Sequence, residues 1–579
     1  MDYELVIRGG TVIDGTGSPR FTGDIAVRDG RVVEVGKVAG RGVREIDATG
    51  LIVAPGIVDL HTHYDAQLHW DPYCTASGWH GTTTVMLANC GFGFAPVRPG
   101  ASERYMRMME NTEQVPYDCM ASTMPWTWET FPQWFDHLRR LRKGVNVATY
   151  LPLNAVLSYV IGPDEAKTRP ATEAERAQMR QILNEAMDAG AAGFSFSYLG
   201  GEGNTHVDHD QTPMPTDIMA KDEAYNLADV LRERGDGVIQ VLSELPGSYK
   251  ERAFSEELAR RSGRPVYHNI LVADGAHPEQ HRSALAWLDE VAAKGLEVWC
   301  QGFTFRKPLE ITPMHYNNWD SFPLFRRLSA AHTREEKVAL VSSPEYREQF
   351  LRDYDPENSR EWSGPLENYV LVEDGGSETF KPFVGRSVAD IAGELGRNPG
   401  QCFLDILQDS NMGAGFITPG TGSDAESICE LLRHPRVLAG TSDGGAHSKH
   451  GNGGYWSTQM LVDLGRDSGA MSLEELHHVL SARSARAAGF TDRGLLTVGS
   501  YADLIIYDLE KLNRTPELRY EVVHDLPGGD WRKVKRPVGI RYIAVNGQVT
   551  FEDGVETGAT PGVMVADEAQ VTTARVAAE

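Results

Sequence analysis

Cysteine is scarce in this chain, and positive charge is in deficit. Six cysteines occur among 579 residues without paired spacing, which argues against a disulfide framework and favours a reducing compartment. Lys and Arg total 56 against 81 Asp and Glu, so the formal net charge is −25. A surface this acidic repels phosphate backbones, and nucleic acid is therefore not an expected partner.

Long apolar runs and a secretory leader are also lacking. The apolar stretch 51–60 contains Pro55 and Gly56 and is far too short to span a bilayer. The first residues, Met1–Glu4, have neither a basic region nor an apolar core, so we expect no signal peptide. With 41% hydrophobic and 24% charged residues, the composition is that of a globular protein. We expect a soluble cytoplasmic protein with no membrane partner.

Both ends of the chain show β patterns. Apolar segments flank Asp29-Gly30 and Asn546-Gly547, and these dipeptides favour hairpin turns. Neither end alone has enough strands to bury one face of a sheet. We therefore expect one small β-sandwich domain built from both chain termini, residues 1–55 and 490–565, followed by a polar tail at 566–579.

The middle of the chain alternates predicted strands with predicted helices. Strands are expected at 57–60, 82–87, 193–197, 238–242, 265–267 and 296–299. This βα alternation predicts an α/β fold with a parallel sheet, most simply a closed TIM-like (β/α)8 barrel over residues 56–489. Residues at about 305–400 are polar and break the rhythm, so we interpret them as an insertion on the face where such barrels carry their chemistry.

Two histidines follow the first strand of the predicted barrel. His61 and His63 come directly after 57–60, and residues i and i+2 of an extended segment point to the same side. Two imidazoles on one side can bind one metal ion. The same spacing also occurs in solvated or core histidines. The place at the carboxyl end of a barrel strand favours the metal site.

Several segments together resemble one enzyme family. Residues 54–63, which contain both histidines, resemble the signature of the amidohydrolase superfamily of metal-dependent hydrolases. More narrowly, the chain is similar to the N-acyl-D-amino-acid deacylases (D-aminoacylases) in three segments, 89–96, 440–444 and 493–504. The similarity extends over residues 1–560. It implies a divalent metal cofactor, with zinc expected, bound as one or two ions.

The resemblance also implies roles for individual side chains. Cys90 takes the place of the carboxylated lysine that binds metal in other members, and a thiol beside a cation ionises and becomes a ligand. A buried apolar cysteine is the alternative. His268 stands at the family's later metal histidine, and Asp443 at its catalytic aspartate, which can also touch the metal; a helix N-cap is the alternative role for Asp443. Tyr198 matches a substrate-binding tyrosine near the reacting carbonyl.

Two positions depart from the family pattern. Gln240 stands where a histidine ligand is expected, and its amide oxygen is a weak, neutral ligand. Ile270, at the substrate-binding position, replaces a lysine that pairs with a substrate carboxylate, and burying a carboxylate beside an aliphatic side chain is costly. This favours a less charged amide, although Arg306 or Lys307 could supply the missing charge. The loop 200–212 either lines the pocket or is solvated.

These features together predict a function. We expect a metal-dependent hydrolase that cleaves the C–N (amide) bond of a small N-acyl compound, with metal-activated water and Asp443 as acid and base. A cyclic amide, imide or lactone is the alternative substrate. A catalytically silent scaffold is the alternative of another class, suggested by the ligand lost at Gln240. The expected partner is a small-molecule amide, and a homo-oligomer stays open.

Overall fold

The structure is a computed structural model. The described residues are 2–201, 206–243, 251–273, 275, 277–315, 323–356, 364–418, 424–512 and 520–566. The predicted tail at 566–579 lies outside them except for its first residue. Among the described residues, no helix combines the length and the apolar character needed to cross a bilayer.

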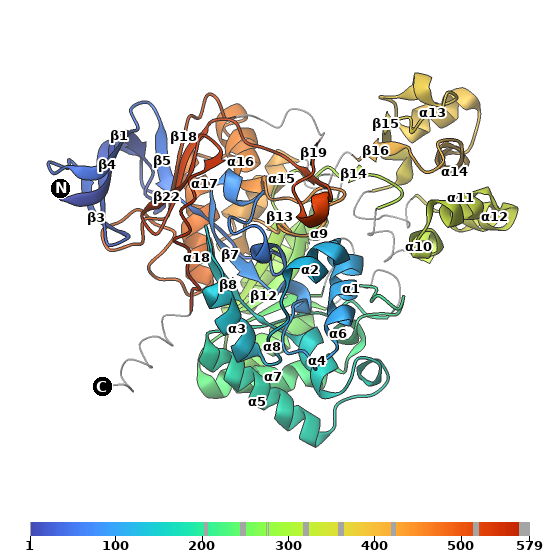
Figure 1. The fold of residues 1–579 in the computed structure, drawn as a ribbon, viewed down its shortest axis with the longest axis horizontal. Coiled ribbons are helices and arrows are strands. Elements are labelled where there is room, and N and C mark those ends of the chain that lie inside the picture. Colours follow the sequence, from blue (N-terminus) through green and yellow to red (C-terminus); the bar gives the residue numbers. More distant parts are fainter. Residues whose placement is uncertain are drawn as a thin grey trace.

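Strands from both ends of the chain lie together at one side of the molecule (Figure 1). They are β1 (Tyr3–Val12), β2 (Phe21–Arg28), β3 (Arg31–Gly36), β4 (Gly42–Asp47), β5 (Ile52–Pro55), β18 (Leu504–Tyr507), β21 (Ile540–Val545), β22 (Gln548–Glu552) and β23 (Val555–Glu556). Strand β5 pairs antiparallel with β18, so the two chain ends share hydrogen bonds. The core of this part contains buried side chains from both ends, among them Ile7, Val53, Leu504 and Ala544.

These nine strands are hydrogen-bonded as one sheet, with the order β23-β22-β21-β18-β5-β1-β2-β3 and β4 beside β1. A sandwich of two separate sheets was expected. The long strand β1 explains the difference, because its first half pairs with β4 and its second half with β5. The predicted hairpin turns are confirmed: φ is 51° at Asp29 and 71° at Gly30, and 46° at Asn546 and 77° at Gly547.

The middle of the chain contains parallel strands, which we call the parallel unit. They are β6 (Ile57–Asp59), β7 (Thr82–Leu87), β8 (Asn146–Thr149), β9 (Leu151–Pro152), β10 (Gly193–Ser197), β11 (Val238–Leu242), β12 (Val266–Val272), β13 (Val298–Phe303) and β17 (Val437–Leu438). Their orders are β6-β7-β8 and β9-β10-β11-β12-β13-β17, and only Tyr150 separates β8 from β9. A parallel bridge between Thr62 and Gly444, just beyond β6 and β17, links the first strand to the last. The predicted barrel requires this order.

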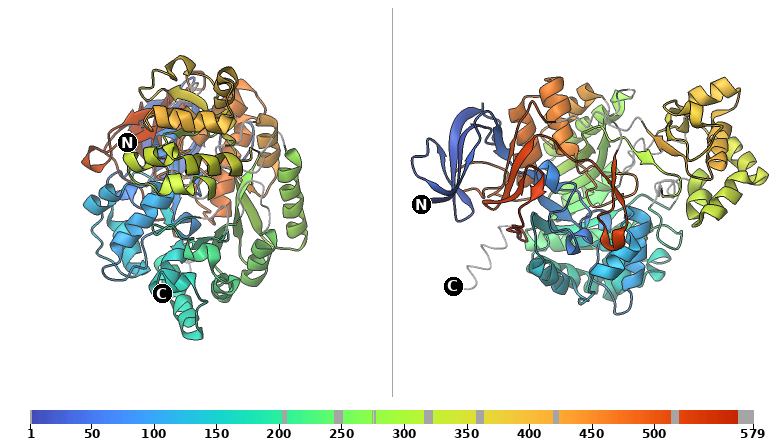
Figure 2. Two further views of the ribbon diagram at one scale, coloured as in Figure 1. Left: turned by 90° about the vertical axis from the view of Figure 1, so that its right-hand side faces the viewer. Right: turned by 45° about the horizontal axis from the view of Figure 1, so that its top comes forward.

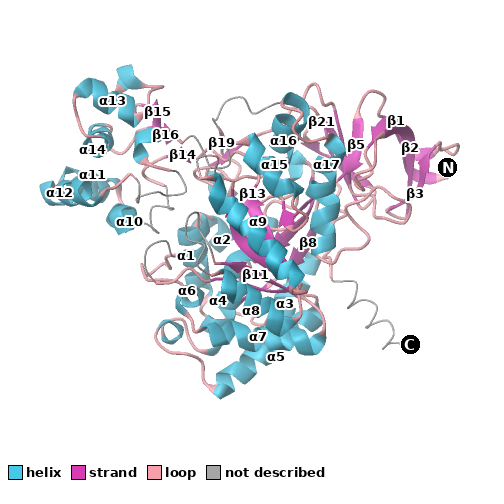
Figure 3. Ribbon diagram, turned by 180° about the vertical axis from the view of Figure 1, so that it is seen from behind, coloured by secondary structure: helices cyan, strands magenta, loops and turns pink. Residues whose placement is uncertain are grey.

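Helices surround the parallel strands (Figure 3). Between β7 and β8 lie α1 (Ser102–Glu113), α2 (Tyr117–Thr123) and α3 (Phe131–Arg140), and from β9 to β17 lie α4 (Leu153–Val160), α5 (Glu173–Ala189), α6 (Pro215–Ile218), α7 (Lys221–Arg234), α8 (Arg252–Ser262), α9 (Pro278–Ala293) and α15 (Ala425–Arg433). Local sequence sets the bounds of α5. A capping box of Thr172 and Glu175 begins it, and Gly190, with φ of 118°, ends it.

The remaining elements follow β17. They are α16 (Trp456–Met460), α17 (Leu473–His477) and α18 (Ser484–Ala487), and then the two-stranded sheet β19 (Glu521–Val523) and β20 (Arg532–Val534). Helix α17 borders the terminal sheet, because Nε2 of its His477 lies 2.9 Å from the hydroxyl of Tyr507 in β18.

The predicted insertion forms a part with its own core, set apart from the parallel unit (Figures 1 and 2). It contains β14 (Glu310–Ile311), α10 (Pro323–Ala330), α11 (Arg334–Ser342), α12 (Pro344–Asp353), β15 (Val370–Glu373), α13 (Val388–Leu395), α14 (Pro399–Asp409) and β16 (Gly415–Ile417). It extends beyond the expected end at 400, because β16 pairs with both β14 and β15. Its buried apolar side chains run from Leu309 to Phe416.

Candidate metal centre

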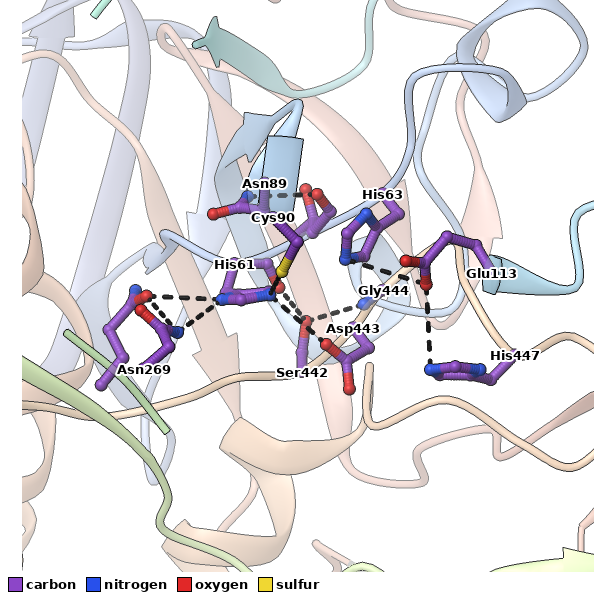
Figure 4. A network of polar contacts seen from close by, with 12 residues as sticks. His61, His63, Asn89, Cys90, Glu113, Asn269, Ser442, Asp443, Gly444 and His447 are labelled. Carbon is purple, nitrogen blue, oxygen red and sulfur yellow. Dashed lines mark hydrogen bonds and ion pairs between the residues drawn. The ribbon is translucent and has the colours of Figure 1, made fainter. Parts of the chain in front are cut away.

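His61 and His63 follow β6, and their imidazoles lie beside the thiol of Cys90 (Figure 4). Sγ of Cys90 is 3.4 Å from Nε2 of His61. One donor atom from each of the three residues lies within 4.8 Å of the other two. All three side chains are buried. The structure thus brings together three residues that the sequence singles out, and their role as metal ligands stays a prediction.

A tight turn after β7 positions the Cys90 thiol. Cys90 has a left-handed backbone with φ of 58°, and its N–H donates a 2.7 Å hydrogen bond to Oε1 of Gln240. The next residue, Gly91, lies so close to β10 that a Cβ there would be 3.0 Å from Cα of Phe196. Burial raises the pKa of the Cys90 thiol well above its ordinary value. Ionisation of this thiol therefore calls for a compensating positive charge.

Asp443 reaches the same centre from the segment after β17. Its Oδ1 is 3.6 Å from Nε2 of His61, and its Oδ2 accepts a 2.8 Å hydrogen bond from Nζ of Lys307. Burial opposes ionisation of this carboxyl, but Lys307 and the neighbouring imidazoles hold its pKa below the ordinary value. The alternative role as a helix N-cap is wrong, because the next helix begins at Trp456.

Amide side chains on β12 and β13 face His61. Nδ2 of Asn269 lies 2.8 Å from Nδ1 of His61, and Oε1 of Gln301 lies 3.4 Å from the same nitrogen. Asn269 also donates a 2.9 Å hydrogen bond to Gln301. Because Nδ1 of His61 faces these amides, its Nε2 faces Cys90 and Asp443. Gln240 likewise lies inside the strands, where it supports the Cys90 turn.

His268 does not lie with these residues, which corrects the expectation that it joins the metal site. The predicted strand was too short: β12 continues to Val272, so His268 stands within the strand rather than after it. Side chains alternate across a strand, and Asn269 faces His61. His268 therefore faces the opposite side, where its Nδ1 is 2.8 Å from Oγ of Ser255 in α8.

Tyr198 is also turned outward, against its expected place at the substrate. Its ring centroid lies 4.9 Å from that of Phe254 in α8. The alternation of β10 is the reason, because Oγ of Ser195 faces the Cys90 turn and accepts from the N–H of Gly91 at 3.1 Å. Ile270 is buried in β12 beside the inward-facing Asn269, and its contact with substrate stays a prediction.

Residues 202–205 of the loop 200–212 lie outside the described part. The segments at Asp208 and at His206 have different surroundings. Asp208 forms ion pairs with Arg104 and Lys167, which favours a structural role. The ring of His206 packs on Phe92 with a centroid distance of 4.9 Å, and Phe92 lies 6.5 Å from the ring of His63. The segment at His206 therefore borders the centre.

Two side chains that the sequence analysis did not single out also lie at the centre. Oε2 of Glu113, at the end of α1, is 3.9 Å from Nε2 of His63 and 3.8 Å from Nε2 of His447. His447 follows Asp443 by four residues, so a search for further histidines after the aspartate would have found it. Glu113 carries no such signal, because it is one of several acidic residues on α1.

The chemistry of these donors suits a divalent metal. Imidazole nitrogen, thiolate sulfur and carboxylate oxygen are the atoms through which zinc is bound in proteins. Nδ1 of the buried His63 has no hydrogen-bond partner among the described residues, although buried polar atoms normally have one. This donor set, gathered at the carboxyl ends of parallel strands, is typical of a metal-dependent hydrolase.

Comparison with known proteins identifies the same class of enzyme. The family model described as "Amidohydrolase family" matches residues 44–551, and the chain belongs to this family of metal-dependent hydrolases. It is 27% identical over 567 residues to N-acyl-D-aspartate deacylase of Alcaligenes xylosoxydans xylosoxydans, covering 97% of this chain and 95% of that protein. It is 23% identical over 572 residues to the D-aminoacylase of the same organism, covering 97% and 98%.

Solved structures show the same fold. The N-acyl-D-glutamate deacylase of Bordetella bronchiseptica, solved with zinc and a phosphonate inhibitor, has a TM-score of 0.64 at 23% identity and covers 98% of this chain and 100% of that one. A D-aminoacylase structure also has a TM-score of 0.64, at 21% identity, with 97% and 100% covered.

Proposed function

We propose that the protein hydrolyses the amide bond of a small N-acyl compound at the centre formed by His61, His63, Cys90 and Asp443. In this proposal the parallel strands close into a (β/α)8 barrel whose carboxyl ends carry the site. The observation that carries the proposal is the convergence of Cys90 and Asp443 on one nitrogen of His61, at 3.4 and 3.6 Å. Family membership and relatives named as deacylases support it.

Different side chains of the centre bind the metal, transfer the proton and position the carboxylate in this proposal. His61, His63 and Cys90 would hold the divalent metal, with zinc first among candidates, as one or two ions. When bound there, such an ion polarises a carbonyl oxygen and lowers the pKa of water to about 7. Asp443 takes the proton from the attacking water and delivers it to the departing nitrogen, so that a carboxylate and an amine leave. Lys307 holds the Asp443 carboxylate in place through its 2.8 Å hydrogen bond.

The substrate we propose carries little negative charge near the reacting group. Lys307, the lysine that could have paired with a substrate carboxylate, is engaged by Asp443. Ile270 adds an aliphatic side chain, and an unpaired buried carboxylate is costly. Relatives of the chain are named as deacylases of N-acyl-D-aspartate and N-acyl-D-glutamate. In this proposal the protein shares with them the hydrolysis of an N-acyl amide, but its substrate lacks their acidic groups.

A substrate comparison tests this function. Purified protein is loaded with Zn²⁺, Co²⁺ or Mn²⁺. Amine release is measured for an N-acetyl-D-amino acid and its neutral carboxamide analogue, and acid release on ring opening is measured for a cyclic imide and a lactone. We expect metal-dependent turnover that is highest for the neutral amide. A strong preference for the free acid would overturn the substrate proposal. Turnover of the rings alone would favour the cyclic alternative, and no turnover with bound metal would favour the scaffold.

A further inference from the structure

Glu113 lies between two imidazoles at the edge of the candidate centre (Figure 4). Its Oε2 is 3.9 Å from Nε2 of His63 on one side and 3.8 Å from Nε2 of His447 on the other. The side chains of Glu113 and His63 are 6% and 2% exposed, and that of His447 is 14% exposed. Three possible ligands of a cation therefore lie together in one largely buried space.

The main chain fixes this arrangement. The N–H of His447 donates a 2.5 Å hydrogen bond to the carbonyl oxygen of Glu113. Oγ of Ser448 donates to the carbonyl of Gln114 at 2.7 Å. Gln114 itself has a left-handed backbone, with φ of 53°, that ends α1. The end of α1 and the segment after Asp443 are thus joined at two successive residues, and the carboxylate is presented to the histidines by a built structure.

The distances match shared coordination better than direct hydrogen bonds. A hydrogen bond between imidazole nitrogen and carboxylate oxygen measures about 2.7–3.2 Å, and 3.8–3.9 Å is too long. Two donors bound to one tetrahedral ion with bonds of about 2.1 Å stand about 3.4 Å apart. The 3.4 and 3.6 Å between the donors around His61 are close to that value. The 3.8 and 3.9 Å around Glu113 are longer, so a bound ion would draw these donors slightly closer together.

The surroundings of the Glu113 carboxylate also favour a bound metal ion. Among the described residues, neither Lys nor Arg forms an ion pair with Glu113, and a buried carboxylate is normally paired or bound to a metal. Two imidazoles and one glutamate also form a known zinc-binding set.

We propose that Glu113 and His447 are metal ligands which, with His63, bind a divalent cation at the centre of His61, His63, Cys90 and Asp443. The centre then extends from β6 to the end of α1. This inference deepens the proposed function, since it concerns the same site, but metal binding is measured without substrate. A failure of metal binding at Glu113 and a failure of amide hydrolysis are therefore seen separately.

The test compares Glu113→Gln, Glu113→Asp and His447→Asn with the wild-type protein. We measure bound zinc by inductively coupled plasma mass spectrometry, affinity by competition with a chelator, and the visible absorption of the Co²⁺-loaded protein. We expect each variant to lose metal or to bind it at least tenfold more weakly, with a changed Co²⁺ spectrum. Circular dichroism identifies misfolded variants, and Glu113→Asp, which keeps the charge but shortens the reach, decides the matter if Glu113→Gln is misfolded.

Glu110→Gln is the matched control. Glu110 lies one turn earlier on α1 and pairs with Arg107 at the surface, so its loss should leave metal content and spectrum unchanged. Wild-type stoichiometry, affinity and Co²⁺ spectrum in folded Glu113→Asp and His447→Asn would overturn the proposal. Loss of metal in these variants, together with a wild-type protein that hydrolyses no amide, would support the site and overturn the proposed function instead.

Discussion

At the scale of single residues, the centre depends on which nitrogen of His61 faces which neighbour. Asn269 and Gln301 lie beside Nδ1 of His61, so that Nε2 of His61 points toward Cys90 and Asp443. Asp443 is in turn held by Lys307. Each of these side chains is buried, so none can turn to solvent to satisfy its polar atoms. Removal of any one of these side chains therefore leaves a buried polar atom of a neighbour without its hydrogen-bond partner.

Replacing Asp443 with Asn tests its part in catalysis. The amide keeps the size of the side chain but cannot take a proton from water, so we expect the turnover number to fall by about 10²–10⁴-fold. Steady-state kinetics on the best amide and metal analysis of the same sample provide the measurement. Near-normal turnover, or complete loss of metal, would contradict the proposed role. Asp467→Asn, at a partly exposed site in the segment after α16, is the control.

At the scale of elements, the turn after β7 carries the thiol, and its shape depends on contact with a neighbouring strand. Gly91 has a φ of 81° and packs against β10, while Gln240 of β11 binds the N–H of Cys90. Gly100 has the same φ of 81°, but a Cβ added there would meet no atom of the described chain within 4 Å. These two glycines separate the effect of backbone conformation from the effect of contact.

Gly91→Ala should therefore be more harmful than Gly100→Ala. Both variants strain a left-handed backbone, at a cost of about 1 kcal/mol. Only Gly91→Ala also pushes a methyl group against the main chain at Phe196, and we expect it to lower metal affinity by at least tenfold. Thermal unfolding and chelator competition on both proteins check this. Equal metal affinity in the two variants would show that the turn does not position Cys90.

The contact between α17 and β18 makes stability depend on pH. Burial lowers the pKa of His477 to about 3, whereas an unfolded chain has a histidine pKa of about 6.5. Below pH 6.5 the unfolded state binds a proton that the folded state does not, so stability is lost as the pH falls from about 6.5 toward 3. At pH 5 this histidine alone costs about 2 kcal/mol.

His477→Gln should reduce that loss. We expect the fall in unfolding free energy between pH 7 and pH 5 to be smaller by about 2 kcal/mol in the variant than in the wild type, because glutamine does not titrate. Chemical denaturation at the two pH values measures the difference. Identical pH dependence in both proteins would mean that His477 is accessible to protons in the folded state.

At the scale of the whole molecule, the terminal sheet shares a hydrophobic core with the parallel unit, since Ile505 and Phe551 lie in the same buried cluster as Val85. The terminal sheet joins both ends through β5 and β18, and the inserted part has a core of its own. The two strands that connect this part to the rest, β14 and β16, lie side by side, with Ile311 opposite Phe416. The chain therefore leaves and re-enters the parallel unit at nearly the same point.

Removal of residues 312–414, with a short Gly-Ser linker in their place, should leave the rest of the protein folded. Because β14 and β16 are adjacent, the linker spans a short distance. We expect metal content to be retained and the melting temperature of the remaining protein to change by less than about 5 °C. Calorimetry and metal analysis measure both. Aggregation or loss of metal would show that the inserted part supports the centre.

The sequence alone determined the features that depend on neighbouring residues. Asp29-Gly30 and Asn546-Gly547 form the expected turns, and Thr172 begins α5. The tertiary structure brings the segments with His61, His63, Cys90 and Asp443 together, and their role as metal ligands stays a prediction. Only the tertiary structure decided which way His268 and Tyr198 face, because one residue of strand length or phase reverses the side of a side chain. It also decided the place of Glu113, since the rotation of a helix against its neighbours is set by packing across the whole core and not by the residues beside it.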